Sequence, residues 1–143
     1  MAARRLRTAL IPTPPGKEPE PAFTTGDIRM PLSDLSIVPA GGTWVVRAGG
    51  AVIGESERAF ELVEGEGAPV IYFPPDDLGM AFLEGTETTT ASRTLGSARF
   101  FSIVTGAGII DDAAWSYATP LHGAERIAGL IAFDSRLVAV EEV

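Results

Sequence analysis

The sequence has no cysteine, a single histidine, His122, and a single lysine, Lys17. Without cysteine there are no disulfides and no thiolate ligands, so structural zinc is excluded, and any metal would have to be held by carboxylates. We therefore predict no cofactor and no metal site. His122 lies in "PLHGAE" with no matching serine motif, so we expect a surface loop residue rather than a member of a catalytic triad.

Long apolar runs are also absent, although 45% of the residues are hydrophobic. No run approaches the roughly 18 apolar residues that span a bilayer, so we expect no membrane partner. The start "MAARRLRTALIP" is basic, but its apolar run is too short for a secretory signal, which predicts a cytoplasmic protein. A chain of 143 residues fits one compact domain.

Positive charge is scarce outside the N-terminal segment. The net charge is −8, and residues 1–26 contribute +2 (four basic and two acidic residues), which leaves −10 for the remainder. An acidic body repels phosphate backbones, so we expect no nucleic-acid partner. Lys17 lies in "IPTPPGKEPEPAF", a composition typical of an extended chain. We therefore predict a Pro-rich, disordered arm over residues 1–26 and a single β domain over residues 27–143.

Short runs of β-branched and aromatic residues recur from about residue 27, separated by Gly, Pro or Asp. "TWVVRA" and "AVIGE" flank Gly49 and Gly50, which predicts a β-hairpin because glycines accept the positive φ angles of a two-residue turn. Further strands are expected at "LSIVP", "RAFELVE", "PVIYFP", "SARFFSIV", "AAWSYA", "GLIAF" and "RLVAVEEV". No strand–helix–strand unit of about 30 residues is present, so the strands should be antiparallel.

Helix is expected in only two places. "PPDDLGMAFL" predicts one or two turns, with Asp76 or Asp77 capping the start and Leu78, Ala81 and Phe82 on one face. A second short turn is expected in "GAERIAGL", ending at Gly129. The predicted fold class is mainly β, a small single domain with one or two short helices.

Two groups of residues between about residues 34 and 143 have a recognisable order and spacing. The first is Tyr72, Pro74 and Asp77, with Glu64 ahead of it, and the second is Ala114, Trp115, Tyr117 and Pro120, with Gly129 and Phe133 behind it. In order and spacing they resemble the domain of unknown function 427 family, which implies a compact fold of several coiled antiparallel sheets, similar to the β-tent group. The family is often labelled a nucleotidyltransferase domain, a label without demonstrated chemistry, so the resemblance implies architecture rather than activity.

The chain departs from the family pattern at "TTTASRTLG". Members commonly carry a Cys, a Pro and a Lys here, and this chain has none of them. Ala91 or Ser92 falls near the cysteine position, and Leu95 replaces the lysine before Gly96. If that Cys or Lys performs a reaction in other members, this protein has lost that reaction or does something else.

Trp115 and Tyr117 are the first candidates for a site, because alternation places both rings on one face of a strand. Burying both would provide on the order of 5 kcal/mol, so a core role is sufficient to explain them. Their polar tips also suit the wall of a small-molecule pocket. Both interpretations stay open.

The carboxylates allow similar alternatives. Asp77 is explained by helix capping or by function. Glu64 shares a face with Leu62 and Phe60, at the margin of an apolar layer, where it needs a partner; Arg47 or Arg99 would form a structural ion pair. In the functional interpretation, Glu64 joins Tyr72, Asp77 and Arg99 around a polar ligand or a Mg²⁺ ion.

"EGTETTTASRTLG" is rich in threonine and is predicted to be a loop. Its Ser92 or Thr94, beside Arg93, could bind an anion. Together with the aromatic face and Tyr72, this loop would enclose a pocket.

The sequence therefore predicts a non-catalytic, small-ligand-binding β domain with an aromatic and carboxylate-lined pocket. Alternatives are a Mg²⁺-dependent nucleotidyl or phosphoryl transferase-like enzyme, with NTP bound near Glu64 and Asp77, and a protein interaction module, homo-oligomeric through an exposed strand. Whether the protein is an enzyme stays open. The candidate ligand-binding residues are Glu64, Tyr72, Asp77, Arg99, Trp115 and Tyr117.

Overall fold

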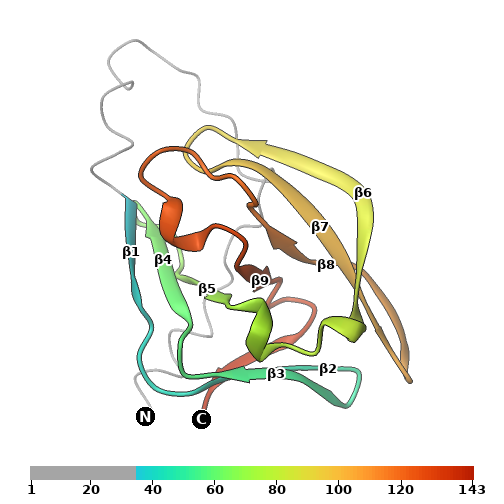
Figure 1. The fold of residues 1–143 in the computed structure, drawn as a ribbon. Coiled ribbons are helices and arrows are strands. Elements are labelled where there is room, and N and C mark those ends of the chain that lie inside the picture. Colours follow the sequence, from blue (N-terminus) through green and yellow to red (C-terminus); the bar gives the residue numbers. More distant parts are fainter. Residues whose placement is uncertain (1–34) are drawn as a thin grey trace.

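The computed structural model describes residues 35–143, which are mainly β (Figure 1). The predicted arm over residues 1–26, and the start of the predicted domain, lie outside the described residues. The elements in this part of the chain are β1 (Leu35–Pro39), β2 (Trp44–Ala48), β3 (Ala51–Ser56), β4 (Phe60–Glu64), β5 (Val70–Phe73), η2 (Pro75–Asp77), η3 (Met80–Phe82), β6 (Leu83–Ser92), β7 (Gly96–Thr105), β8 (Gly108–Ser116), η4 (Glu125–Ile127), β9 (Ile131–Phe133) and β10 (Ala139–Glu142).

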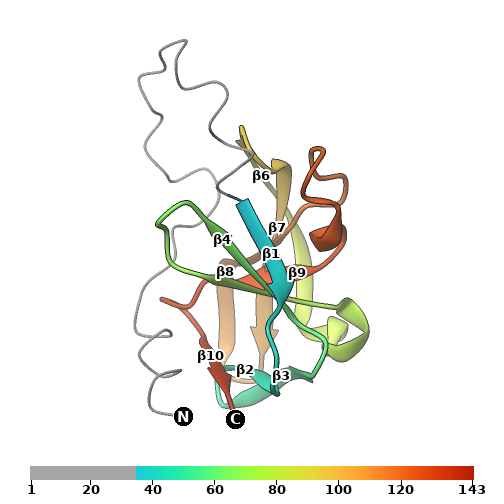
Figure 2. The same ribbon diagram turned by 90° about the vertical axis from the view of Figure 1, so that its left-hand side faces the viewer.

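The strands form two antiparallel sheets, which confirms the predicted fold class. One sheet has seven strands in the order β1-β4-β5-β9-β8-β7-β6, and the other has three in the order β10-β2-β3. The small sheet lies across the lower end of the molecule in Figures 1 and 2. Neither sheet closes on itself, because β1, β6, β10 and β3 stand at four separate edges.

The predicted β2–β3 hairpin is confirmed. Ala48 pairs with Ala51, and the two residues between them, Gly49 and Gly50, have φ values of 56° and 81°. Two consecutive positive φ angles match the type of turn whose twist suits adjacent antiparallel strands, and glycine adopts them without steric cost.

Strand alternation divides the core into two apolar clusters, one on each face of the large sheet. On β5, Phe73 belongs to the cluster that also contains Trp44 and Ile53 of the small sheet. Tyr72 points the other way, into a cluster completed by Ile127 of η4. The large sheet is thus packed against the small sheet on one face and against the segment around η4 on the other.

The helical predictions are partly wrong. Instead of one capped helix after Pro74 there are two separate 3₁₀ turns, η2 and η3, joined by residues Leu78 and Gly79. No side chain caps η2, so the capping role predicted for Asp76 or Asp77 is wrong. The second predicted turn is present as η4. No helix between residues 35 and 143 has the length and apolar character needed to cross a bilayer.

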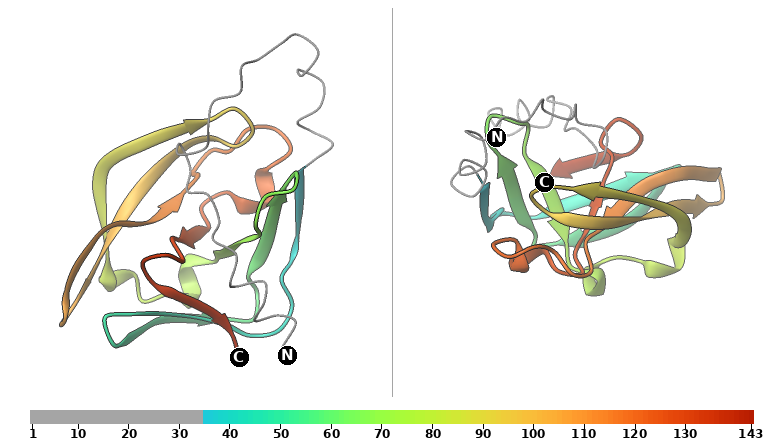
Figure 3. Two further views of the ribbon diagram at one scale, coloured as in Figure 1. Left: turned by 180° about the vertical axis from the view of Figure 1, so that it is seen from behind. Right: turned by 90° about the horizontal axis from the view of Figure 1, so that it is seen from above.

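The threonine-rich segment predicted to be a loop is mostly a strand. Residues 83–92 form β6, and only residues 93–95 turn into β7. β6 pairs with a single strand of its sheet and its side chains are exposed or half-buried, so its sequence lacks the apolar alternation of a covered strand. Figure 3 shows β6 and β7 running together along one side of the molecule.

Candidate functional site

The side chains of Tyr72 and Trp115 contact each other on one face of the large sheet. Both residues pair with Ala132, Tyr72 from β5 and Trp115 from β8, so the three side chains share one level and one face. Because Ala132 is small, the two rings can approach each other over it. The indole Nε1–H of Trp115 donates a hydrogen bond to the Tyr72 hydroxyl at 3.2 Å. Trp115 is 1% exposed and Tyr72 is 2% exposed.

Tyr117 follows directly after β8 and is 1% exposed, in the same cluster as Trp115. The prediction that both rings face one side is therefore confirmed. Phe100 packs against Trp115 with ring centroids 6.1 Å apart. This burial matches the core interpretation of the two rings, and their role as the wall of a ligand pocket stays a prediction.

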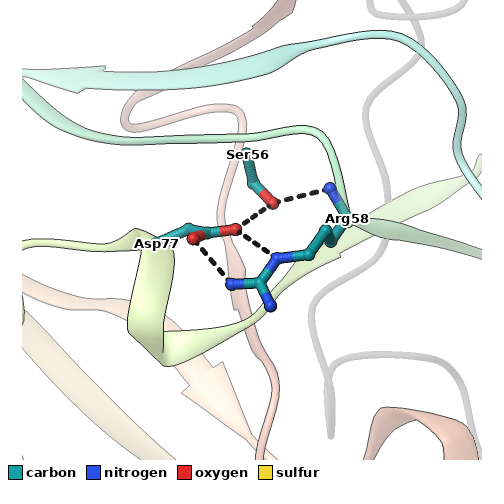
Figure 4. Close-up of polar contacts among 3 residues, drawn as sticks. All are labelled: Ser56, Arg58 and Asp77. Carbon is teal, nitrogen blue, oxygen red and sulfur yellow. Dashed lines mark hydrogen bonds and ion pairs between the residues drawn. The ribbon is translucent and has the colours of Figure 1, made fainter.

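Asp77 is held by side chains rather than by a helix end. Its Oδ2 accepts a hydrogen bond from Ser56 Oγ at 2.6 Å and another from Arg58 Nε at 3.2 Å, and its Oδ1 accepts from Arg58 Nη2 at 2.8 Å. The Ser56 hydroxyl also accepts the backbone N–H of Arg58 at 2.9 Å. Figure 4 shows these three residues converging from the end of β3, the residues after it and η2. We call them the Asp77 cluster.

A close approach of backbones brings the parts of the Asp77 cluster together. Gly54 of β3 forms a bridge with Leu78, and the Gly79 N–H donates to the Ile53 carbonyl at 2.7 Å. A Cβ atom at Gly54 would overlap the Leu78 side chain and lie 2.7 Å from the carbonyl oxygen of Asp77. The absence of a side chain at Gly54 therefore allows η2 to lie against β3.

The electrostatics of the Asp77 cluster keep its carboxylate charged. Hydrogen bonds from Arg58, and secondarily from Ser56, hold the pKa of Asp77 below its usual value. The same pair raises the pKa of Arg58. The Arg58 side chain is 63% exposed and that of Asp77 is 21% exposed, so a fixed ion pair faces solvent.

The remaining predicted site residues lie apart. Glu64 ends β4, where it pairs with Leu35. Neither arginine predicted as its partner forms an ion pair with it in the described part of the chain: Arg47 pairs with Glu141 at 3.0 Å, and Arg99 lies over the Phe101 ring at 5.7 Å from its centroid. The predicted structural ion pair of Glu64 with Arg47 or Arg99 is therefore wrong.

Glu64 and Asp77 lie at opposite ends of the β4–β5 pair. Phe60, at the start of β4, is opposite Tyr72, near the end of β5, whereas Glu64 extends past Val70 at the other end. The four residue-to-residue steps from Phe60 to Glu64 span roughly 13 Å of strand. The two carboxylates do not share a binding position. In residues 35–143 no three carboxylates or histidines gather in a way that could hold a metal ion.

Arg99 also lies on a different face from the aromatic rings. Phe100, its neighbour on β7, points into the cluster of Trp115 and Tyr117, so alternation directs Arg99 to the opposite face of the sheet. The structure therefore brings Tyr72, Trp115 and Tyr117 together, and places Glu64, Asp77 and Arg99 at three other positions. The ligand-binding roles of all six stay predictions.

Sequence reasoning missed Ser56 and Arg58. They occur in "GESERA" with a spacing of two, which is the signal that both side chains project the same way from an extended chain. Their partner is 21 residues from Ser56 along the chain, so only the folded structure identifies it.

A second polar group was also missed, around Asp112. Its two carboxylate oxygens accept hydrogen bonds from Thr86 and Thr88 of β6, each at 2.8 Å, and its backbone N–H donates to the Ser102 hydroxyl at 3.1 Å. Asp112 has a φ of 50°, the single positive value of a non-glycine residue in the described part of the chain. The hydrogen bonds of Asp112 link two irregularities of the strand register, one in β6 between Gly85 and Thr89 and one in β7 between Phe101 and Ile103. A structural role at these bulges accounts for the group.

The positions where this chain departs from the family pattern have structural roles. Leu95 is buried in the aromatic cluster, and its carbonyl accepts the N–H of Leu121 at 3.0 Å. The Ser92 hydroxyl accepts the N–H groups of Thr94 and Leu95, which closes the turn between β6 and β7. Anion binding by Ser92 or Thr94 beside Arg93 stays a prediction.

The fold and the Asp77 cluster define a small, mainly β domain of two open antiparallel sheets with a charged pair on its surface. The chain belongs to the family described as a domain of unknown function (DUF427), whose match covers residues 36–143. The predicted resemblance is thus confirmed. Comparison with curated proteins finds no match.

Proposed function

We propose that the protein is a non-catalytic, small-ligand-binding β domain and that the Asp77 cluster is its polar recognition group. The observation that carries the proposal is the bidentate contact of Arg58 with Asp77, with Ser56 holding the same carboxylate. A guanidinium fixed in this way loses little conformational freedom when a ligand binds.

The hydrogen-bonding capacity of Arg58 supports this role. Asp77 takes the Nε–H and one N–H of Nη2, and Nη1 and the other N–H of Nη2 have no partner in the described part of the chain. These donors lie in one plane and suit a carbonyl or carboxylate oxygen. The partly exposed Asp77 carboxylate can in turn accept a donor from the same ligand.

Charge near the cluster favours one class of ligand. Asp76 is exposed and close enough to raise the pKa of Arg58, and Glu57 precedes Arg58 in the chain. These carboxylates oppose multiply charged anions such as nucleotides. The proposed ligand is therefore a small neutral or zwitterionic molecule with a carbonyl or carboxylate oxygen beside an N–H or O–H donor.

Thermal-shift measurements with a panel of such metabolites test the proposal, because a ligand of the folded state raises the melting temperature by mass action. Arg58→Ala should abolish the shift that a binding metabolite gives. Arg47→Ala is the matched control, since Arg47 is also an exposed arginine in an ion pair, with Glu141 on the small sheet, and should leave the shift unchanged. A shift that survives Arg58→Ala would refute the assigned site.

The transferase-like alternative predicts a shift with Mg²⁺ and NTP that neither component gives alone. It has less support, because Glu64 and Asp77 lie at opposite ends of β4 and β5. If the combination of Mg²⁺ and NTP raises the melting temperature and no metabolite of the panel does, this alternative replaces our proposal.

We also propose that the protein acts in the cytoplasm, without a nucleic-acid or membrane partner. The net charge of −8 argues against a nucleic-acid partner, because acidic surfaces repel phosphate backbones. The lack of a long apolar run argues against a membrane partner. Cell fractionation of the full chain checks the location.

A further inference from the structure

Arg99 of β7 is an exposed arginine whose charge is not matched by a carboxylate. By contrast, Arg47, Arg58 and Arg136 each pair with a carboxylate, and Arg126 donates to a backbone carbonyl. In the described part of the chain the Arg99 guanidinium forms no ion pair and donates no hydrogen bond, although acidic residues outnumber arginines there. Its N–H donors can therefore bind another molecule.

The guanidinium of Arg99 is nevertheless held in one place. Its Cζ atom lies 5.7 Å from the centroid of the Phe101 ring, a distance at which an aromatic ring attracts a cation. Phe101 is directly opposite Gly85 of β6, and a Cβ atom at Gly85 would lie 3.4 Å from Arg99 Nη2. The guanidinium thus lies over an aromatic ring and beside a residue that has no side chain. A cation held in this way loses little conformational freedom when it binds an anion.

Hydroxyl groups flank Arg99 on the same face of the sheet. Its direct partners on the neighbouring strands are Thr89 of β6 and Ser116 of β8. Side chains at directly opposed positions project to the same face, with Cβ atoms about 4.5–5.5 Å apart. Ser116 is buried, whereas Thr89 is exposed and can supply a further donor to an anion at Arg99.

The strands are irregular next to the guanidinium. The register of β6 shifts after Gly85 and that of β7 shifts after Phe101, so the Gly85–Phe101 pair borders both irregularities. Asp112, whose φ is 50°, links the two through its hydrogen bonds. Bulges and positive φ angles of non-glycine residues are frequent beside binding sites, where they redirect side chains. The irregular backbone is therefore in keeping with a binding site at this place.

We infer that Gly85, Thr89, Arg99 and Phe101 form a binding site for the carboxylate group of a small molecule, and we call these residues the Arg99 site. A guanidinium can donate two parallel hydrogen bonds to a carboxylate. The net charge of −8 favours a singly charged carboxylate over a more highly charged phosphate. Glu87, exposed in the irregular part of β6, adds to this preference.

The Arg99 site goes beyond the proposed function and does not depend on it. The Asp77 cluster is formed by the end of β3, the residues after it and η2, whereas the Arg99 site lies on β6 and β7, which run together in Figure 3. Each site can therefore be tested while the other is left intact.

Titration of the isotope-labelled full chain with acetate, followed by nuclear magnetic resonance, tests the inference. Chloride is exchanged for acetate at constant ionic strength, and the backbone amide signals of Gly85 and Phe101 are measured. We expect their shifts to saturate, with half-saturation between about 1 and 100 mM, because so small a ligand makes few contacts. Inorganic phosphate should bind more weakly than acetate.

Substitutions of charged residues separate the Arg99 site from other arginines. Arg99→Gln should abolish the saturating shifts, since it removes the guanidinium and keeps a long polar side chain. Glu87→Gln should strengthen acetate binding about twofold, because it removes a neighbouring negative charge. Arg47→Gln is the matched control, an exposed arginine on the small sheet, and should leave the half-saturation unchanged. Arg58→Ala should also leave it unchanged, so failure of the Arg99 site and failure of the Asp77 cluster are separate results.

Gly85→Val tests the place of the guanidinium. A valine side chain at residue 85 would fill the space beside Arg99 Nη2, and it should weaken acetate binding about tenfold as measured at the Phe101 amide. Acetate binding that Gly85→Val leaves unchanged would overturn the assigned geometry.

Other results would overturn the Arg99 site as a whole. They are the absence of saturating shifts up to about 200 mM acetate, saturating shifts that persist in Arg99→Gln, and tighter binding of phosphate than of acetate.

Discussion

At the scale of single residues, the hydrogen bond between Trp115 and Tyr72 gives the aromatic cluster its most specific contact. We predict that Tyr72→Phe lowers the free energy of unfolding by about 1–3 kcal/mol, because it leaves the buried indole N–H of Trp115 without this acceptor. Urea denaturation followed by tryptophan fluorescence measures the change. Trp115→Phe should cost less in the Tyr72→Phe background than in the wild type, since the hydrogen bond is already absent there. Additive costs would show that the two side chains are not coupled.

The candidate site was predictable only in part at this scale. Period-two alternation was enough to place Trp115 and Tyr117 on one side, since it depends on neighbouring residues alone. The partners of Asp77 were not predictable, because Ser56 and Arg58 reach it through the bridge between β3 and Leu78. The position of Asp77 near a predicted helix start favours a capping role, but Ser56 and Arg58, which are distant along the chain, donate the hydrogen bonds to its carboxylate.

At the scale of elements, most strands were predictable from short runs of β-branched and aromatic residues, as in the mostly buried β2, or from alternation, as in the first half of β7, where Ala98 and Phe100 are buried and Ser97 and Arg99 are exposed. β6 was not, because its pairing depends on the neighbouring β7 and both of its faces are polar. The prediction of a single helix after Pro74 is wrong for a similar reason. Gly79 donates its N–H to Ile53 of β3 instead of continuing a helix, so a contact with a distant strand overrides the local apolar spacing.

The contact between β3 and η2 gives a prediction at this scale. Gly54→Ala should lower the free energy of unfolding by about 1–3 kcal/mol, because its Cβ would overlap Leu78 and push η2 away from β3. The same displacement should separate Ser56 from Asp77 and reduce any ligand response that depends on the cluster.

Gly106→Ala is the control for Gly54→Ala, since a Cβ at Gly106 meets no atom within 4 Å and its φ is not positive. Thermal denaturation compares the two variants. Equal melting temperatures would mean that η2 does not depend on the close approach at Gly54.

At the scale of the whole molecule, two apolar clusters on opposite faces explain why the domain needs few helices. The small sheet covers one face of the large sheet, and the chain around η4 covers the other. Most charged residues are left on the surface, and in the Asp77 cluster the hydrogen bonds from Arg58 and Ser56 hold the pKa of the Asp77 carboxylate below its usual value. Protonation of the Asp77 carboxylate is therefore coupled to the free energy of unfolding of the domain.

The pH dependence of unfolding tests this coupling. Since the pKa of Asp77 is lower in the folded chain than in the unfolded chain, its stabilising contribution is fully present above the usual aspartate value of about 3.9. The contribution is lost as the pH falls through the lowered folded value. Asp77→Asn should therefore melt below the wild type at pH 6, and the difference should shrink as the pH falls below about 3.9. Asp76→Asn removes the adjacent exposed carboxylate instead and should melt close to the wild type at pH 6. A constant difference between wild type and Asp77→Asn from pH 6 to pH 2 would show that Asp77 does not contribute through its ionised form.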